Sequence, residues 1–141
     1  MNLINKKFKT LDDLNKKIFE ELLALLKTVC SPCFILSGGN SPRPLFRRIS
    51  QHKEYFKKTI FLMSDERIVE TEDSESNEGE FLRLSNIARD NLISLRNKKI
   101  IQKLNNISSY DLAVLGMGDD GHFASIFPDC LNTFDAINSQ N

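Results

Sequence analysis

The sequence predicts an α/β fold with a mainly parallel sheet and helices on both faces. Short apolar runs of strand length alternate with segments of helical periodicity along the chain. The strand-like runs are apolar almost throughout, as is typical of strands that are buried on both faces of a parallel sheet. No internal repeat or long low-complexity linker divides the 141 residues, so we expect residues 1–141 to form one domain.

The first expected element is a helix from about Leu11 to Thr28. Thr10 is placed to cap this helix, with Asp13 three residues later in a position similar to that of a capping box. The apolar residues recur at helical spacing and form one stripe: Leu11, Leu14, Ile18, Leu22, Leu25 and Leu26. A strand is expected at residues 33–37, because the segment C-F-I-L-S is short and apolar and ends at two glycines.

The middle of the chain predicts a second helix that begins near Pro42, since proline is tolerated in a first helical turn. Leu45, Phe46 and Ile49 are its expected inward residues. The run T-I-F-L-M-S at residues 59–64 predicts the next strand, and an acidic loop is expected over residues 70–80.

Three further elements are expected in the second half of the chain. Residues 81–95 predict a helix, residues 99–104 predict a minor strand, and residues 111–116 predict another buried strand. Helices and strands in this order predict a three-layer, Rossmann-like sheet. In such sheets ligands bind outside the carboxyl ends of the strands.

Composition excludes several classes of function. Lysine and arginine balance aspartate and glutamate at 19 each, so net charge gives no reason to expect nucleic acid or a membrane surface as a partner. The N-terminus lacks the apolar core of a secretory signal, and no run approaches the roughly 20 apolar residues that span a bilayer. Cys30 and Cys33 form a C-x-x-C pair, which we interpret as structural because zinc needs a second ligand pair. A reducing, cytoplasmic location fits these features best.

All three buried-type strands end in a polar, glycine-bearing or charged cluster, which predicts one shared site. The cluster S-G-G-N-S-P follows the first strand and is typical of an anion-binding loop, although a plain strand-to-helix turn favours the same residues. The cluster S-D-E-R follows the second strand. There Arg67 is a candidate to bind phosphate or carboxylate, with Asp65 to orient it; a simple exit into solvent is the alternative.

The segment G-M-G-D-D-G-H-F-A-S, residues 116–125, follows the last strand. His122 lies there among glycines and aspartates, whereas His52 has the surroundings of a surface helix residue. An imidazole has the intrinsic pKa to accept a proton near neutral pH, so we interpret His122 as a candidate general base.

At these residues the sequence resembles the 6-phosphogluconolactonase family, within the wider glucosamine-6-phosphate isomerase/6-phosphogluconolactonase group. S-G-G-N-S-P resembles the family's sugar-phosphate loop, and F-L-M-S-D-E-R-I-V its D-E-R strand end. D-L-A-V-L-G-M-G-D-D-G-H-F-A-S-I-F-P resembles its G-M-G-x-D-G-H signature.

The resemblance implies that the protein hydrolyses 6-phospho-D-glucono-1,5-lactone to 6-phosphogluconate, a step of the pentose phosphate pathway, with no metal and no organic cofactor. It implies that His122 deprotonates a water molecule. Asp120 would orient the imidazole or shape the turn, and Arg67 would bind the phosphate or polarise the ester. The other implied substrate-binding residues are Ser37, Gly38, Gly39, Asn40, Ser41, Asp65 and Gly118. The sequence leaves the oligomeric state open.

Three questions stay open from the sequence. The family's Ser-Asn pair matches either Ser76–Asn77 or Ser85–Asn86. Family members continue with further helices and strands where this chain has about a dozen residues after Pro128, so we expect a C-terminally shortened fold. The alternative functions are an amino-sugar phosphate isomerase/deaminase, which usually carries D-E-Y and F-N-E-P instead of Arg67 and S-I-F-P, and a non-catalytic, truncated fragment that needs a partner.

Overall fold

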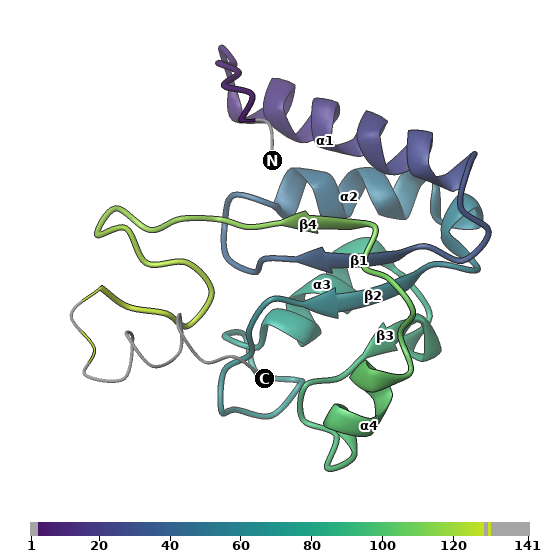
Figure 1. The fold of residues 1–141 in the computed structure, drawn as a ribbon. Coiled ribbons are helices and arrows are strands. Elements are labelled where there is room, and N and C mark those ends of the chain that lie inside the picture. The colour runs from purple at the N-terminus through teal and green to yellow at the C-terminus, as the bar shows by residue number, and fades with distance from the viewer. Residues whose placement is uncertain (1–2, 129, 131–141) are drawn as a thin grey trace.

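The computed structural model describes residues 3–128 and 130, and its centre is a four-stranded sheet in the order β3–β2–β1–β4 (Figure 1). All three strand pairs are parallel, which confirms the predicted α/β class. The strands are β1 (Cys33–Leu36), β2 (Ile60–Met63), β3 (Leu92–Ile93) and β4 (Leu112–Val114). Because the strands run the same way, their carboxyl ends meet at one edge of the sheet.

One face of the sheet carries the main hydrophobic core. The register pairs Phe34 with Phe61, and Phe61 with Leu92, so these three side chains form a row across the sheet. Leu36 and Met63 form the next row, and all five side chains are at most 8% exposed. Alternation along each strand therefore places the largest apolar side chains on the face that the helices cover.

Helices α1 (Leu11–Leu26), α2 (Arg43–Gln51) and α3 (Asn77–Ser85) pack together on this face (Figure 1). Their buried residues join the core: Phe19, Leu22, Leu45, Phe46, Ile49 and Phe81. A short 3₁₀ helix, η1 (Lys53–Phe56), adds Phe56. The inward residues predicted for α2 are confirmed, since Leu45, Phe46 and Ile49 are all fully buried.

The opposite face has a thinner cover. The chain crosses this side of the sheet between β3 and β4, and α4 (Ile100–Asn105) lies on that crossing (Figure 1). Lys103 of α4 borders the same hollow as Ile60 and Ile93 of the sheet. Within the described residues, no helix combines the length and apolar character that crossing a membrane would require.

The cap predicted for α1 is confirmed. The Thr10 hydroxyl accepts a hydrogen bond from the Asp13 backbone N–H (3.0 Å) and donates one to the Asp13 carboxylate (2.8 Å). The helix ends at Leu26, two residues before the predicted end.

The helix predicted over residues 81–95 is wrong in both bounds. The predicted acidic loop ends earlier, because Ser76 accepts a hydrogen bond from the Gly79 N–H (3.0 Å) and starts α3 at Asn77. Asn86 ends the helix in the left-handed region (φ 53°). A 3₁₀ helix, η2 (Arg89–Asn91), and strand β3 follow. Pairing of Leu92 and Ile93 with Phe61 and Leu62 replaces the helical continuation.

The minor strand predicted over residues 99–104 is also wrong, because this segment forms α4. Ile100 and Leu104, four residues apart, are partly buried, whereas Ile101 is 66% exposed. That spacing is typical of one helical face, and in so short a run the sequence does not separate it from a strand.

We predict that Phe61→Ala lowers the free energy of unfolding by about 3 to 5 kcal/mol, because it leaves a cavity in the core. Phe61 is fully buried and its ring lies 5.0 Å from that of Phe81 and 6.0 Å from that of Phe34. Urea unfolding followed by circular dichroism measures the change. Ile68→Ala is the control, since Ile68 is fully exposed. Equal unfolding midpoints for the two variants would contradict this account of the core.

Candidate active site

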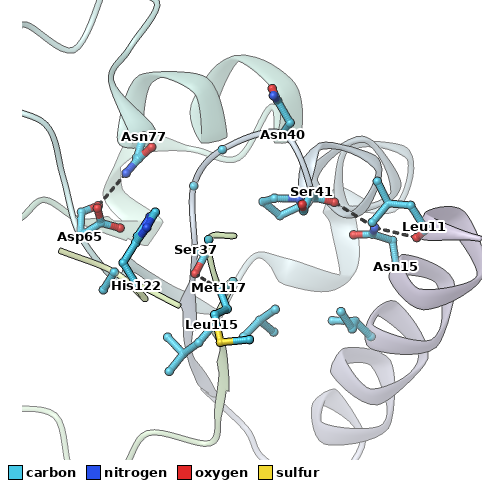
Figure 2. Close-up of a pocket in the computed structure, with 18 of the residues that line it drawn as sticks. Leu11, Asn15, Ser37, Asn40, Ser41, Asp65, Asn77, Leu115, Met117 and His122 are labelled. Carbon is cyan, nitrogen blue, oxygen red and sulfur yellow. Dashed lines mark hydrogen bonds between the residues drawn. The ribbon is translucent and has the colours of Figure 1, made fainter. Parts of the chain in front are cut away.

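A pocket of about 380 Å³ lies at the carboxyl ends of β1, β2 and β4 (Figure 2). The segments after these three strands all contribute to its wall. The structure thus brings the three clusters that follow the predicted strands to one place. All the predicted site residues except Asp120 line it: Ser37, Gly38, Gly39, Asn40, Ser41, Asp65, Arg67, Gly118 and His122.

Ser37 joins the ends of the three strands. Its hydroxyl accepts a hydrogen bond from the Gly116 N–H after β4 (2.8 Å) and lies 3.4 Å from the Ser64 hydroxyl after β2. Its own N–H donates to the Val114 carbonyl (2.9 Å). Ser37, at the end of β1, therefore holds the ends of β4 and β2 close together at the base of the pocket.

The glycine loop between β1 and α2 forms one wall. A Cβ on Gly38 would overlap the side chain of Asn77, so only glycine lets the two segments approach this closely. Gly39 has φ 85°, in the left-handed region that favours glycine. The Asn15 amide of α1 donates to the Ser41 carbonyl (3.0 Å) and ties the loop to that helix. No side chain caps the N-terminus of α2.

The segment after β2 supplies both signs of charge. The Asp65 carboxylate accepts hydrogen bonds from the hydroxyls of Ser64 (3.1 Å) and Ser125 (3.2 Å), so it links β2 to the segment that carries His122. Arg67 lines the pocket and is exposed. Among the described residues its guanidinium pairs with no carboxylate, which leaves it available to an anionic ligand.

His122 is held by its neighbours in the turn. Its Nδ1 lies 2.5 Å from the Asp120 carboxylate, and its ring stacks on Phe127 with 4.8 Å between the ring centres. The hydrogen bonds from His122 lower the pKa of the Asp120 carboxyl. Because an ionised carboxylate only accepts, the proton of a neutral His122 resides on Nδ1 and Nε2 carries the lone pair. Asp120 therefore lies behind the imidazole rather than in the pocket wall.

Asn77 is a pocket residue that the sequence left undecided. It lines the pocket, and its amide donates to the Asp65 carbonyl (3.1 Å; Figure 2). In the second candidate pair, Ser85 is buried at the end of α3 and Asn86 caps that helix. Of the two pairs, only Ser76–Asn77 contributes a residue to the pocket, namely Asn77. Ser76 caps α3 and so places Asn77 in the first turn of that helix.

Glu66 was not among the predicted site residues, yet it underlies the site. Its side chain is 5% exposed, and its carboxylate accepts hydrogen bonds from the N–H groups of Arg67, Asn77 and Glu78 at 2.7 to 2.8 Å. Although burial raises the pKa of Glu66, these hydrogen bonds and that of the Ser76 hydroxyl bring the pKa below its usual value. The sequence shows the three letters D-E-R but not which of them points inward.

The pocket also has an apolar side that sequence reasoning missed. Leu11, Leu14 and Ile18 of α1 face it on one side, and Leu115 and Met117 follow β4 on the other. Within residues 3–128 and 130, no group of three or more histidine, cysteine or acidic side chains is arranged to bind a metal ion.

Comparison with known proteins gives one family. The family described as glucosamine-6-phosphate isomerases/6-phosphogluconolactonase matches residues 5–136. A curated 6-phosphogluconolactonase from Pseudomonas putida is 32% identical over 79% of this chain and 51% of its own length. The chain spans about half the length of this relative.

Solved structures show the same likeness. A 6-phosphogluconolactonase from Shewanella baltica has a TM-score of 0.81 and 26% identity, over 96% of this chain and 65% of that one. The 6-phosphogluconolactonase from Thermotoga maritima has a TM-score of 0.75 and 28% identity, over 96% of this chain and 66% of that one. The sheet and helices described above are therefore those of a known fold.

We predict that Gly118→Ala displaces the His122 ring, because a Cβ at residue 118 would overlap that ring. The hydrogen bond between Nδ1 and Asp120 should then be lost, and the ¹⁵N chemical shifts of the imidazole should change. Gly116→Ala is the matched control, since a Cβ there would lie 3.8 Å from its nearest neighbour, Ser37. Unchanged His122 shifts in Gly118→Ala would show that the ring is not packed against residue 118.

We predict that ionised Glu66 stabilises the fold only above its lowered pKa. Its stabilising effect is fully present above the usual carboxyl pKa of 4.5 and is lost as the pH falls through the folded-state value. Urea unfolding between about pH 6 and about pH 3 should therefore show a smaller loss of stability for Glu66→Gln than for the unaltered protein. Parallel pH profiles of the two proteins would contradict the prediction.

Proposed function

We propose that this chain, which belongs to the glucosamine-6-phosphate isomerase/6-phosphogluconolactonase family, hydrolyses 6-phospho-D-glucono-1,5-lactone to 6-phosphogluconate. One observation carries the proposal: His122, which bonds through Nδ1 to Asp120, lines the same pocket as Arg67, whose guanidinium pairs with no carboxylate among the described residues. Hydrolysis of a phosphorylated lactone uses a base to activate water and a cation to hold the phosphate. The match covers 51% of the Pseudomonas putida relative, so the proposal is tested by measuring hydrolysis with this chain.

His122 is the proposed general base. With Nδ1 bonded to Asp120, the Nε2 lone pair can take a proton from a water molecule as that water attacks the lactone carbonyl. Asp120 orients the ring and stabilises the imidazolium that forms. The proton then passes from His122 to the ring oxygen as the ester bond breaks, which yields the sugar hydroxyl and a carboxylic acid. The acid releases its proton to solvent and becomes the carboxylate.

The glycine loop and Arg67 are the proposed phosphate site. The loop of residues 38–41 lines the pocket, and α2 begins directly after it with no side-chain cap. Arg67 adds a full positive charge that no described carboxylate neutralises. Since a phosphate monoester is dianionic near neutral pH, this end of the pocket suits it better than the apolar side does.

The location and the ligand are also part of the proposal. The three cysteines are free thiols, which fits the reducing cytoplasm that we propose as the location of the protein. The proposed ligand is the sugar phosphate lactone, with no nucleic acid or membrane as a partner.

We predict that His122→Ala lowers the catalysed rate of lactone hydrolysis about 100- to 10,000-fold, because it removes the general base. The assay uses freshly prepared 6-phosphogluconolactone and subtracts spontaneous hydrolysis, after circular dichroism shows that each variant is folded. His52→Ala, which changes the other histidine, should keep the unaltered rate.

Three results would count against the proposal. The first is equal activity of His122→Ala and the unaltered protein, which would remove His122 from the mechanism. Release of ammonia from glucosamine 6-phosphate would indicate a deaminase instead. A folded, unaltered chain with no rate above the spontaneous one would show that the chain does not hydrolyse the lactone alone.

A further inference from the structure

We propose that Arg96 is a positioning residue for Arg67: it fixes the main chain after β2 so that the Arg67 side chain is presented to the ligand anion. The inference rests on the proposed function in one respect, since it takes Arg67 to be the anion-binding group. Arg96 belongs to none of the three clusters that line the pocket.

The first observation is the contact between the two arginines. The Arg96 guanidinium donates a hydrogen bond to the Arg67 carbonyl (3.1 Å), 29 residues away in the sequence. The same Nη2 lies 3.5 Å from the Glu66 carboxylate. Arg67 is thereby held on both sides of its Cα, because Glu66 accepts from its N–H at 2.7 Å and Arg96 donates to its carbonyl.

The second observation is that Arg96 lies between two buried carboxylates. Its Nε lies 4.0 Å from the carboxylate of Glu78, whose side chain is fully buried, and its Nη2 contacts Glu66, which is 5% exposed. A buried carboxylate is costly unless a cation or hydrogen-bond donors compensate it. Removing the Arg96 charge would therefore disturb both glutamates.

The third observation connects these glutamates to the pocket. Glu66 accepts from the N–H groups of Asn77 and Glu78 (both 2.8 Å), so it anchors the start of α3, and Asn77 lines the pocket. Glu78 accepts from the Ser94 hydroxyl (2.7 Å) and the Leu95 N–H (2.6 Å), just before Arg96. The segments at residues 66–67, 76–78 and 94–96 thus form one hydrogen-bonded unit beneath the site.

This unit orders the backbone of Arg67 while its side chain stays exposed. Ordering a long side chain on binding costs conformational entropy. A fixed backbone lowers that cost, because the guanidinium has fewer positions available before the ligand binds. Arg96 therefore acts on ligand affinity through Arg67 and Asn77, without touching the ligand.

The experiment compares Arg96→Met and Arg96→Lys with Arg48→Met in the full chain. Arg48 is the matched control, because its side chain is also 28% exposed and it pairs with Asp12 at 2.7 Å, between α2 and α1. Two quantities are measured by NMR: the affinity for 6-phosphogluconate, and the hydrogen-exchange rates of the Arg67 and Asn77 amides relative to amides of β1.

We expect Arg96→Met to bind 6-phosphogluconate about tenfold more weakly, as loss of hydrogen bonds to a charged group predicts. The amides of Arg67 and Asn77 should exchange faster, while those of β1 keep their rates. Arg96→Lys should be intermediate, because a lysine keeps the charge but not the fork of donors. Arg48→Met should keep the unaltered affinity and the unaltered exchange at Arg67 and Asn77.

Unaltered affinity together with unaltered exchange in Arg96→Met would overturn the inference. Faster exchange throughout the sheet in Arg96→Met would also overturn it, and so would an equal loss of affinity in Arg48→Met. Either result shows a general loss of stability. If the unaltered protein does not bind 6-phosphogluconate, the proposed function fails instead. The exchange rates then decide the inference alone: a local increase at Arg67 and Asn77 supports it, and no increase overturns it.

Discussion

The pairing of β1 with β2 on one side and β4 on the other is the constraint on which the site depends. The register places Leu36 opposite Met63 and Val114, so the three strands reach their carboxyl ends at the same level. The residues that follow are then close enough for Ser37 to hydrogen-bond with Gly116. A shift of one residue would turn the core side chains to the other face and separate these exits, and the buried rows that contain Phe34 and Leu36 oppose it.

At the strand ends, the acidic side chains after β2 are held by hydrogen bonds, whereas the Arg67 side chain is exposed. The carboxylates of Asp65 and Glu66 have different partners: Asp65 accepts hydrogen bonds from serine hydroxyls, and Glu66 accepts them at the start of α3. By contrast, no described carboxylate neutralises the Arg67 guanidinium, and the His122 imidazole bonds through Nδ1 to Asp120. The pocket therefore combines a guanidinium and an imidazole with carboxylates that already accept hydrogen bonds.

The charged groups of the chain differ in what they can contribute. Pairs such as Lys17–Glu21 lie on the surface, where solvent screens them and their effect on stability is small. The unit of Glu66, Glu78 and Arg96 is different, because its carboxylates are buried and donors surround them. In some proteins such units specify one arrangement of the chain more than they add to stability. Here the unit lies directly beneath the pocket, where Asn77 and Arg67 line the wall.

Local patterns in the sequence predict the α/β class, the cap of α1, the strands β1, β2 and β4, and the three clusters that share the pocket. Each of these depends on a local pattern: periodicity, a capping residue, or a run of apolar residues that ends in glycine. Contacts between distant segments make Leu92 and Ile93 a strand, bring Asn77 and not Asn86 to the pocket, and turn Glu66 inward to meet Arg96. The physical reason is that a two-residue strand and a buried carboxylate gain their stability from partners distant in the chain, which no local pattern of residues reveals.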